Sequence, residues 1–138
     1  MPAVASGRIL SFLAFDFGTK RTGVATGNSL LRSATALTTI AAEGEARMLR
    51  IAKLIAEWQP DALVVGVPVH PDGAPHDNTR RAQRFGRQLH ARFRLPVHAV
   101  DERYSTTEAT ASGAADVDAA SAAIILDQHL RSLEHNPP

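Results

Sequence analysis

Apolar residues near the start of the chain cluster in short runs that predict β-strands. Residues 10–15 form a near-continuous apolar run, which is typical of a strand buried on both faces. A tight turn around Gly18 leads to a second β-prone run at residues 22–25, and a Thr-rich run with alternating character follows at residues 34–40. Three consecutive strands with short links predict an antiparallel meander.

The pattern then changes to a helical period. Apolar positions recur at spacings of three and four over residues 41–58: Met48, Ile51, Leu54 or Ile55, and Trp58. Glu43 and Glu45 suit the first turn of this helix because the helix dipole favours acids there, and Pro60 ends it. The apolar run at residues 62–67 predicts a buried parallel strand.

A second predicted helix follows a long loop, VHPDGAPHDN, of the kind that often carries function. Asn78 is suited to cap this helix, which extends to about Phe93. Its apolar stripe consists of Ala82, Phe85, Leu89 and Phe93. Arg80, Arg84 and Arg87 fall on the opposite face, either as a solvated surface or in contact with phosphate.

The remaining chain predicts one strand and two helices. The strand is expected at residues 97–100, a short helix with a capping-box pattern at 105–112, and a final helix from 117 or 118 to about 131, with a frayed tail from Ser132. The order β-β-β-α-β-α-β-α-α predicts an α/β protein with a mixed sheet and helices on its faces. Sites in such sheets lie at the carboxyl ends of strands.

Composition fits a single globular domain over residues 1–138, with a core at about 9–131. The formal net charge of +1 does not indicate a nucleic-acid partner. Among the 15 basic residues only Lys20 and Lys53 are lysines, and the others are arginines. The preference for arginine suits phosphate binding but is equally explained by a GC-rich genome. The absence of cysteine excludes disulfide and thiolate chemistry and fits a cytoplasmic protein, and no segment predicts a signal peptide or a membrane span.

Acidic residues follow the predicted strands and open the last helix. Asp16 ends the first strand, Asp101 and Glu102 end the last strand, and Asp118 begins the final helix. Three such carboxylates could converge at one end of the sheet and hold divalent cations such as Mg²⁺, which prefer oxygen ligands. Cations bound in this way support displacement at a phosphodiester.

Each acid also has a simpler interpretation. Asp16 could accept backbone hydrogen bonds in a turn, Asp118 could only cap its helix, and the acids after the last strand could be solvated. Asp101 and Glu102 point to opposite sides of a strand, so only one of them should join a site, and periodicity does not choose between them.

The histidines of the long loop offer a second possible metal site. His70 and His76 flank Asp72 and Asp77, a grouping that suits a transition metal, although loop histidines are commonly solvated. A serine nucleophile is poorly supported because no serine lies in a G-x-S-x-G elbow.

Four motifs in order, LAFDFGTKRTGVA, LVVGVPVHPDG, VDERYSTTEA and VDAASAAIIL, resemble the YqgF family over residues 9–130. The resemblance implies an RNase H-like fold, related to RuvC-type resolvases, with a mixed five-stranded sheet of three antiparallel strands and parallel crossovers, and helices on both faces. Family members are described as pre-16S rRNA nucleases or as Holliday junction resolvases.

The resemblance assigns roles to individual residues. Asp16, Glu102 and Asp118 match the family's acids and would be catalytic and metal-binding, so Glu102 is preferred over Asp101. Basic and hydroxyl positions in the motifs would contact nucleic acid: Lys20, Arg21, Arg103 and Thr106. The chain departs from the family at Thr22, where isoleucine is common, and in a short segment between Glu108 and Asp118 that puts substrate choice in doubt.

The sequence therefore predicts a hydrolase, a cytoplasmic endonuclease that uses one or two Mg²⁺ or Mn²⁺ ions and acts on precursor 16S rRNA in ribosome biogenesis. Branched DNA is the alternative substrate, with the protein a monomer or a homodimer. Two other classes remain. An actin-like ATPase shares the DFGTKRTG hairpin but needs two domains, and a nucleic-acid-binding module would retain the acids without cleavage.

Overall fold

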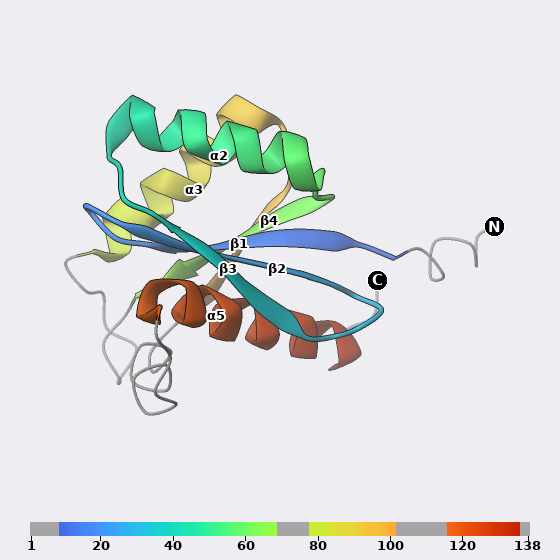
Figure 1. Ribbon diagram of the computed structural model, residues 1–138. Coiled ribbons are helices and arrows are strands. Elements are labelled where there is room, and N and C mark those ends of the chain that lie inside the picture. The colour runs from blue at the N-terminus through green and yellow to red at the C-terminus, as the bar shows by residue number, and fades with distance from the viewer. Residues whose placement is uncertain (1–8, 69–77, 102–115, 136–138) are drawn as a thin grey trace.

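A five-stranded mixed sheet with strand order β3-β2-β1-β4-β5 forms the centre of the computed structural model, which describes residues 9–68, 78–101 and 116–135 (Figure 1). The strands are β1 (Ser11–Phe17), β2 (Thr22–Asn28), β3 (Ala34–Ile40), β4 (Ala62–Val67) and β5 (Val97–Asp101). The first three pair in antiparallel fashion, whereas β4 is parallel to β1 and β5 is parallel to β4. The predicted meander followed by parallel crossovers is confirmed.

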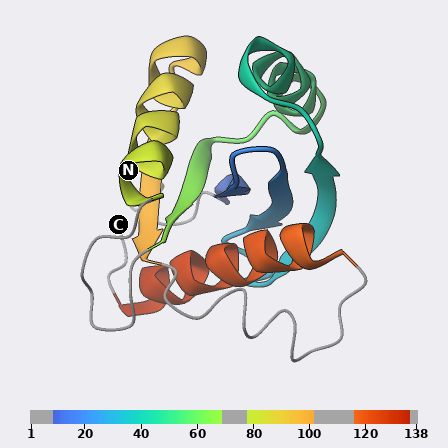
Figure 2. The same ribbon diagram turned by 90° about the vertical axis from the view of Figure 1, so that its left-hand side faces the viewer.

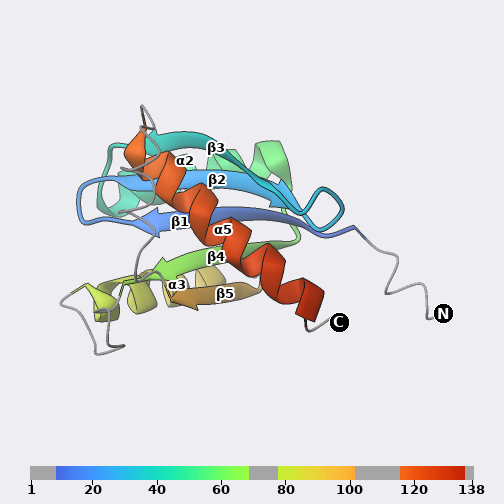
Figure 3. The same cartoon turned by 90° about the horizontal axis from the view of Figure 1, so that it is seen from below.

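Helices cover both faces of this sheet. The helices α2 (Gly44–Trp58) and α3 (Thr79–Phe93) lie on one face, and α5 (Val117–His135) lies on the other (Figures 1 and 2). Seen from the α5 side, this helix crosses the strands diagonally (Figure 3). Within the described residues, no helix has the length and apolar character needed to cross a membrane.

The central strand β1 is buried on both faces, as its apolar run predicts. Leu13 and Phe15 pack with α2 and α3, while Phe12 and Ala14 pack with α5. All four side chains are at most 2% exposed. This alternation defines which face of the sheet each later residue of β1 occupies.

Several predicted boundaries need correction. The first predicted helix starts at Gly44 rather than residue 41, so Glu43 occupies its N-cap position and lies outside the first turn. Asn78 precedes α3 but its side chain makes no capping hydrogen bond. It accepts instead from the Arg81 guanidinium, at 3.0 Å.

The final helix is longer than predicted. It continues to His135, past the predicted end near residue 131, so the expectation that the chain frays from Ser132 is wrong. Leu130 is buried and Leu133 packs against the same apolar cluster, which stabilises this last turn. The long loop at 69–77 and the short helix expected at 105–112 lie outside the described residues.

The first turn of α5 lies directly against β2 at Gly23. A Cβ atom on Gly23 would lie 1.8 Å from the carbonyl oxygen of Asp118, so only glycine fits. The α5 surface that faces the sheet begins with small buried residues, Ala119, Ser121 and Ala122. Small side chains let the helix backbone approach the strand this closely.

Replacing Gly23 with alanine is expected to lower the free energy of unfolding by about 3 kcal/mol, because the new methyl group overlaps helix backbone that must shift. Urea denaturation measures the change. Gly86→Ala in α3 is the matched control: its Cβ would meet Val97 at 3.6 Å, an ordinary contact, and it should stabilise the helix by about 0.5–1 kcal/mol. Equal effects of the two substitutions would contradict the tight contact at Gly23.

Candidate active site

Asp16 lies near the carboxyl end of the central strand and is partly buried. Its neighbours across the sheet are Gly23 on β2 and Gly66 on β4, so neither adjacent strand places a side chain beside it. Phe15 and Phe17 belong to the α2 and α3 face, so Asp16 points to the α5 face.

Asp118 reaches the same place from α5. The close contact at Gly23 holds the Asp118 backbone against β2, and Gly23 is the residue that pairs with Asp16. Both acids therefore lie on one face of the sheet at neighbouring positions. The structure brings together two of the three acids that the sequence predicts for the site.

The register of β5 bears on the choice between Asp101 and Glu102. Val100 pairs with Gly66, in the same row as Asp16, and packs against the α5-side core. Asp101 is the next residue, so it faces the α3 side of the sheet, away from Asp16 and Asp118. The register thus disfavours Asp101.

Three predicted site residues, Glu102, Arg103 and Thr106, lie outside the described residues, as do His70 and His76. In the part of the chain that the structure describes, no group of three metal-ligating side chains comes together. Asp16 and Asp118 supply two carboxylates, and a third oxygen ligand has to come from elsewhere.

The cap of α5 is Asp116, a residue that the sequence reasoning missed. Its Oδ1 accepts from Thr39 Oγ1 at 2.7 Å and from the Ala119 N–H at 3.1 Å. The Thr39 hydrogen bond, followed by the Ala119 N–H, holds the pKa of Asp116 below its ordinary value. Because Asp116 takes the capping role, Asp118 does not serve as the N-cap. The signal was an aspartate directly before the helix start at Val117.

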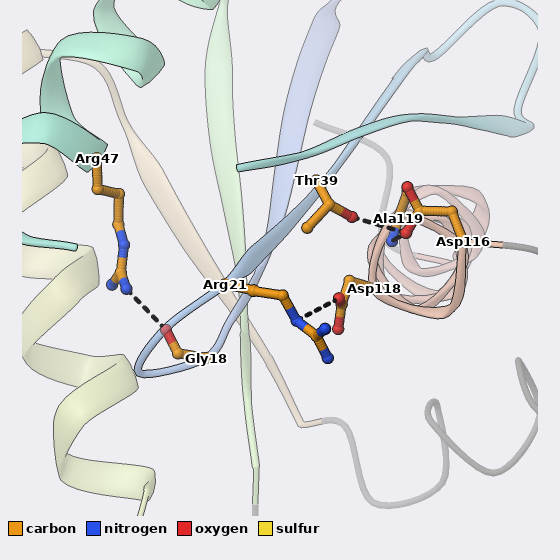
Figure 4. A network of polar contacts seen from close by, with 7 residues as sticks. All are labelled: Gly18, Arg21, Thr39, Arg47, Asp116, Asp118 and Ala119. Atoms are coloured by element: carbon orange, nitrogen blue, oxygen red, sulfur yellow. Dashed lines mark hydrogen bonds and ion pairs between the residues drawn. The ribbon is translucent and has the colours of Figure 1, made fainter. Parts of the chain in front are cut away.

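The β1–β2 hairpin brings basic side chains to the acids. Arg21 Nε lies 3.1 Å from Asp118 Oδ2, and both side chains are partly exposed (Figure 4). A hollow of about 350 Å³ is lined here by Gly18, Thr19, Lys20, Arg21 and Asp118. Lys20 and Arg21, predicted to contact nucleic acid, therefore lie beside one of the two acids.

Arg47 of α2 holds this hairpin from the other side and was also missed. It is 5% exposed, and its Nη2 donates to the carbonyl of Gly18 at 2.9 Å (Figure 4). The same nitrogen donates to the carbonyl of Thr19 at 2.7 Å. Its guanidinium lies 4.7 Å from the centre of the Phe17 ring. Burial lowers the pKa of Arg47 from its usual value. Arg47 precedes Ile51 by four residues and so belongs to the buried stripe, which is the signal that could have identified it.

The predicted basic stripe of α3 is divided between different surroundings. Arg80, Arg84 and Arg87 are all exposed. Arg84 lines a groove between α2 and α3, whereas Arg87 lines an apolar groove between α3 and β5. Arg84 and Arg87 thus lie beside different grooves of the same helix, and the contact of these three arginines with nucleic acid stays a prediction.

The sheet order and the two helical layers define an RNase H-like domain. Solved structures share this fold: RuvC of T. thermophilus in complex with a Holliday junction substrate gives a TM-score of 0.57 at 17% identity, covering 91% of this chain and 96% of that chain. A second Thermus thermophilus RuvC structure gives 0.54 at 13% identity, covering 91% and 97%.

The chain belongs to the RuvX family, described as Holliday junction resolvase, whose profile matches residues 10–132. Similar proteins carry the name "Putative pre-16S rRNA nuclease". The protein from Polaromonas sp. (strain JS666 / ATCC BAA-500) is 68% identical over 133 residues, 96% of each chain. The protein from Albidiferax ferrireducens is 62% identical over 132 residues, 96% of this chain and 85% of that protein.

Replacing Asp116 with alanine is expected to lower the free energy of unfolding by about 1 kcal/mol at neutral pH, the usual cost of a lost cap. Asp116→Asn keeps a capping oxygen and should cost less. Because the folded-state pKa of Asp116 is lowered, its charge stabilises the fold above its ordinary pKa, and this contribution is lost as pH falls through the folded value. Urea denaturation across the acidic range should therefore show a shallower acid loss for Asp116→Asn than for the wild type. Parallel curves would contradict this role.

Proposed function

We propose that this protein is a metal-dependent endonuclease that hydrolyses phosphodiester bonds, with precursor 16S rRNA as its substrate and maturation of the 5′ end of that RNA as its role. The observation that carries the proposal is the placement of Asp16 and Asp118 on one face of the sheet, held by the contact at Gly23. Family membership and the names of the similar proteins support the same activity and the same RNA. Such a role belongs in the cytoplasm.

The acids suit a hard divalent cation. Asp16, Asp118 and Glu102 would offer carboxylate oxygens, which Mg²⁺ and Mn²⁺ prefer. The first two are carried by a central strand and by a helix whose first turn is fixed against the sheet. A divalent cation bound there would supply Lewis-acid activation of water and neutralise charge at the phosphate.

The residues of the chain would orient the reacting groups and bind the phosphates of the substrate. Asp16, Glu102 and Asp118 orient the reacting groups, and no protein nucleophile is needed. Lys20 and Arg21, beside Asp118, contact the phosphates that flank the scissile bond. Arg103 and Thr106, in the motif that contains Glu102, contribute further contacts. Cleavage leaves a 5′-phosphate and a 3′-hydroxyl.

Resolution of branched DNA is the second candidate. The family description and the fold shared with a RuvC bound to a Holliday junction favour it. Symmetric cleavage of a junction requires two active sites related by a two-fold axis, and therefore a dimer. A protein that stays monomeric at working concentration would count against this candidate.

Asp16→Asn is expected to lower cleavage by at least about 100-fold, because it removes a charged ligand from the centre of the site while nearly preserving its shape. The assay uses an end-labelled RNA that spans the boundary between the leader and 16S rRNA, with Mn²⁺, Mg²⁺ or chelator, beside a four-way DNA junction. Glu57→Gln, on the exposed surface of α2, is the matched control and should cleave normally. RNA binding without cleavage by the wild type would indicate a binding module instead.

Arg21→Gln is expected to raise the affinity of the substrate-free protein for Mn²⁺ by about two- to fivefold, because the Arg21–Asp118 ion pair competes for the carboxylate. Isothermal titration calorimetry measures the affinity. Lys20→Gln removes the same charge from the same hollow without breaking that pair. Equal gains in both variants would mean that general charge, and not the ion pair, controls the affinity.

A further inference from the structure

A groove between α2 and α3 lies across the β1–β2 hairpin from the acids. Its volume is about 740 Å³, within the range of about 300–1,000 Å³ that ligand sites usually occupy. Its lining includes Phe17, Arg47, Met48, Arg81, Arg84 and Phe85. Aromatic and apolar side chains therefore form part of the wall, and guanidinium groups line the remainder.

The lining of this α2–α3 groove carries a net positive charge, since it contains four arginines and one glutamate. Glu45 is paired with Arg92, with two nitrogen–oxygen distances of 2.7 Å. Arg81 donates to the neutral Asn78 amide, which leaves its charge uncompensated by that contact. Arg84 is exposed and makes no ion pair with the described residues. The charges of Arg81 and Arg84 are therefore available to an anion that enters the groove.

Arg47 adds a cation at the base of the groove. Its hydrogen bonds go to the carbonyls of Ala42, Gly18 and Thr19. None of the described carboxylates forms an ion pair with it, and Glu43 acts on its charge only through space. Carbonyl oxygens satisfy its N–H groups but do not cancel its charge. Its field therefore adds to that of Arg81 and Arg84.

The hairpin links the groove to the acids. Phe17 lines the α2–α3 groove, and the next residue, Gly18, lines the hollow that also contains Lys20, Arg21 and Asp118. Arg47 and Arg21 lie on opposite sides of the hairpin (Figure 4). A polyanion that leaves the acids can thus pass the hairpin and enter the groove without leaving basic surroundings.

We propose that the α2–α3 groove is a second binding site, which takes the sugar–phosphate backbone of a single-stranded RNA segment that flanks the cleaved bond. The proposal rests on the proposed nuclease function and assigns a route to its substrate. Guanidinium groups suit phosphate oxygens, and proteins that bind single strands combine a basic groove with apolar or aromatic walls. A recess between two helices admits one strand more readily than a rigid duplex.

The test measures binding of a labelled single-stranded RNA by fluorescence anisotropy in the presence of chelator, so that cleavage plays no part. The double variant Arg81→Gln/Arg84→Gln is expected to weaken binding about tenfold and to reduce the salt dependence of log K by about 1.4, or 0.7 for each lost phosphate contact. Arg50→Gln, an exposed arginine of α2 that does not line the groove, is the matched control and should bind within about twofold of the wild type.

The outcomes separate the two proposals. Binding by the double variant that equals that of Arg50→Gln, with thermal unfolding unchanged, overturns the groove site whether or not the wild type cleaves RNA. An equal loss on a duplex RNA overturns its assignment to a single strand. If the wild type cleaves nothing but its binding still depends on Arg81 and Arg84, the nuclease proposal fails and the groove stands as a single-strand binding site.

Discussion

The contact between α5 and Gly23 is the constraint on which the site depends. Gly23 has no side chain, and the residues of α5 that face it are small. The helix backbone therefore packs directly against the strand backbone. Because Asp118 lies at this contact and Gly23 pairs with Asp16, the packing of the core also sets two acidic residues at neighbouring positions on one face of the sheet. Core packing is dense and transmits small shifts, so a change that moves α5 by one methyl group also moves the acid. Stability and site geometry therefore have the same origin.

Bringing two carboxylates together costs electrostatic free energy, and the structure offsets that cost in two ways. The amino-terminal end of α5 carries partial positive charge, which favours the acids of its first turn, and Asp116 caps that end through Thr39 and Ala119. Arg21 then pairs with Asp118 from the neighbouring hairpin. The ion pair is partly exposed, so it is weak enough to be exchanged for a cation. The acids are thus stabilised without being permanently neutralised.

The sequence predicted the sheet well because each strand has a local signature. The Thr-rich third strand and the apolar fourth strand have the bounds that their patterns indicate, Ala34–Ile40 and Ala62–Val67. Asp16 and Asp118, which the sequence proposed for the site, lie at neighbouring positions on one face of the sheet. Periodicity alone did not choose between Asp101 and Glu102, whereas the register of β5 disfavours Asp101, in agreement with the resemblance. The end of α5 was placed too early because the stabilising contact of Leu133 comes from a sheet distant in sequence. The spacing of Arg47 to Ile51 indicated a buried position, but its contact with the hairpin was missed because the carbonyls of Thr19 and Gly18 lie 28 and 29 residues away.

A buried arginine whose hydrogen bonds all go to carbonyls is costly, because its charge is removed from water and no carboxylate pairs with it directly. Arg47 occupies such a position beside Phe17, at the point where the hairpin separates the acids from the α2–α3 groove. An aliphatic residue would fill the space at lower electrostatic cost but would not hold the hairpin carbonyls. A carboxylate partner would hold the arginine but would cancel the potential of the groove. The observed arrangement meets both needs: it fixes the hairpin that carries Arg21 and leaves positive charge where a phosphate backbone can approach.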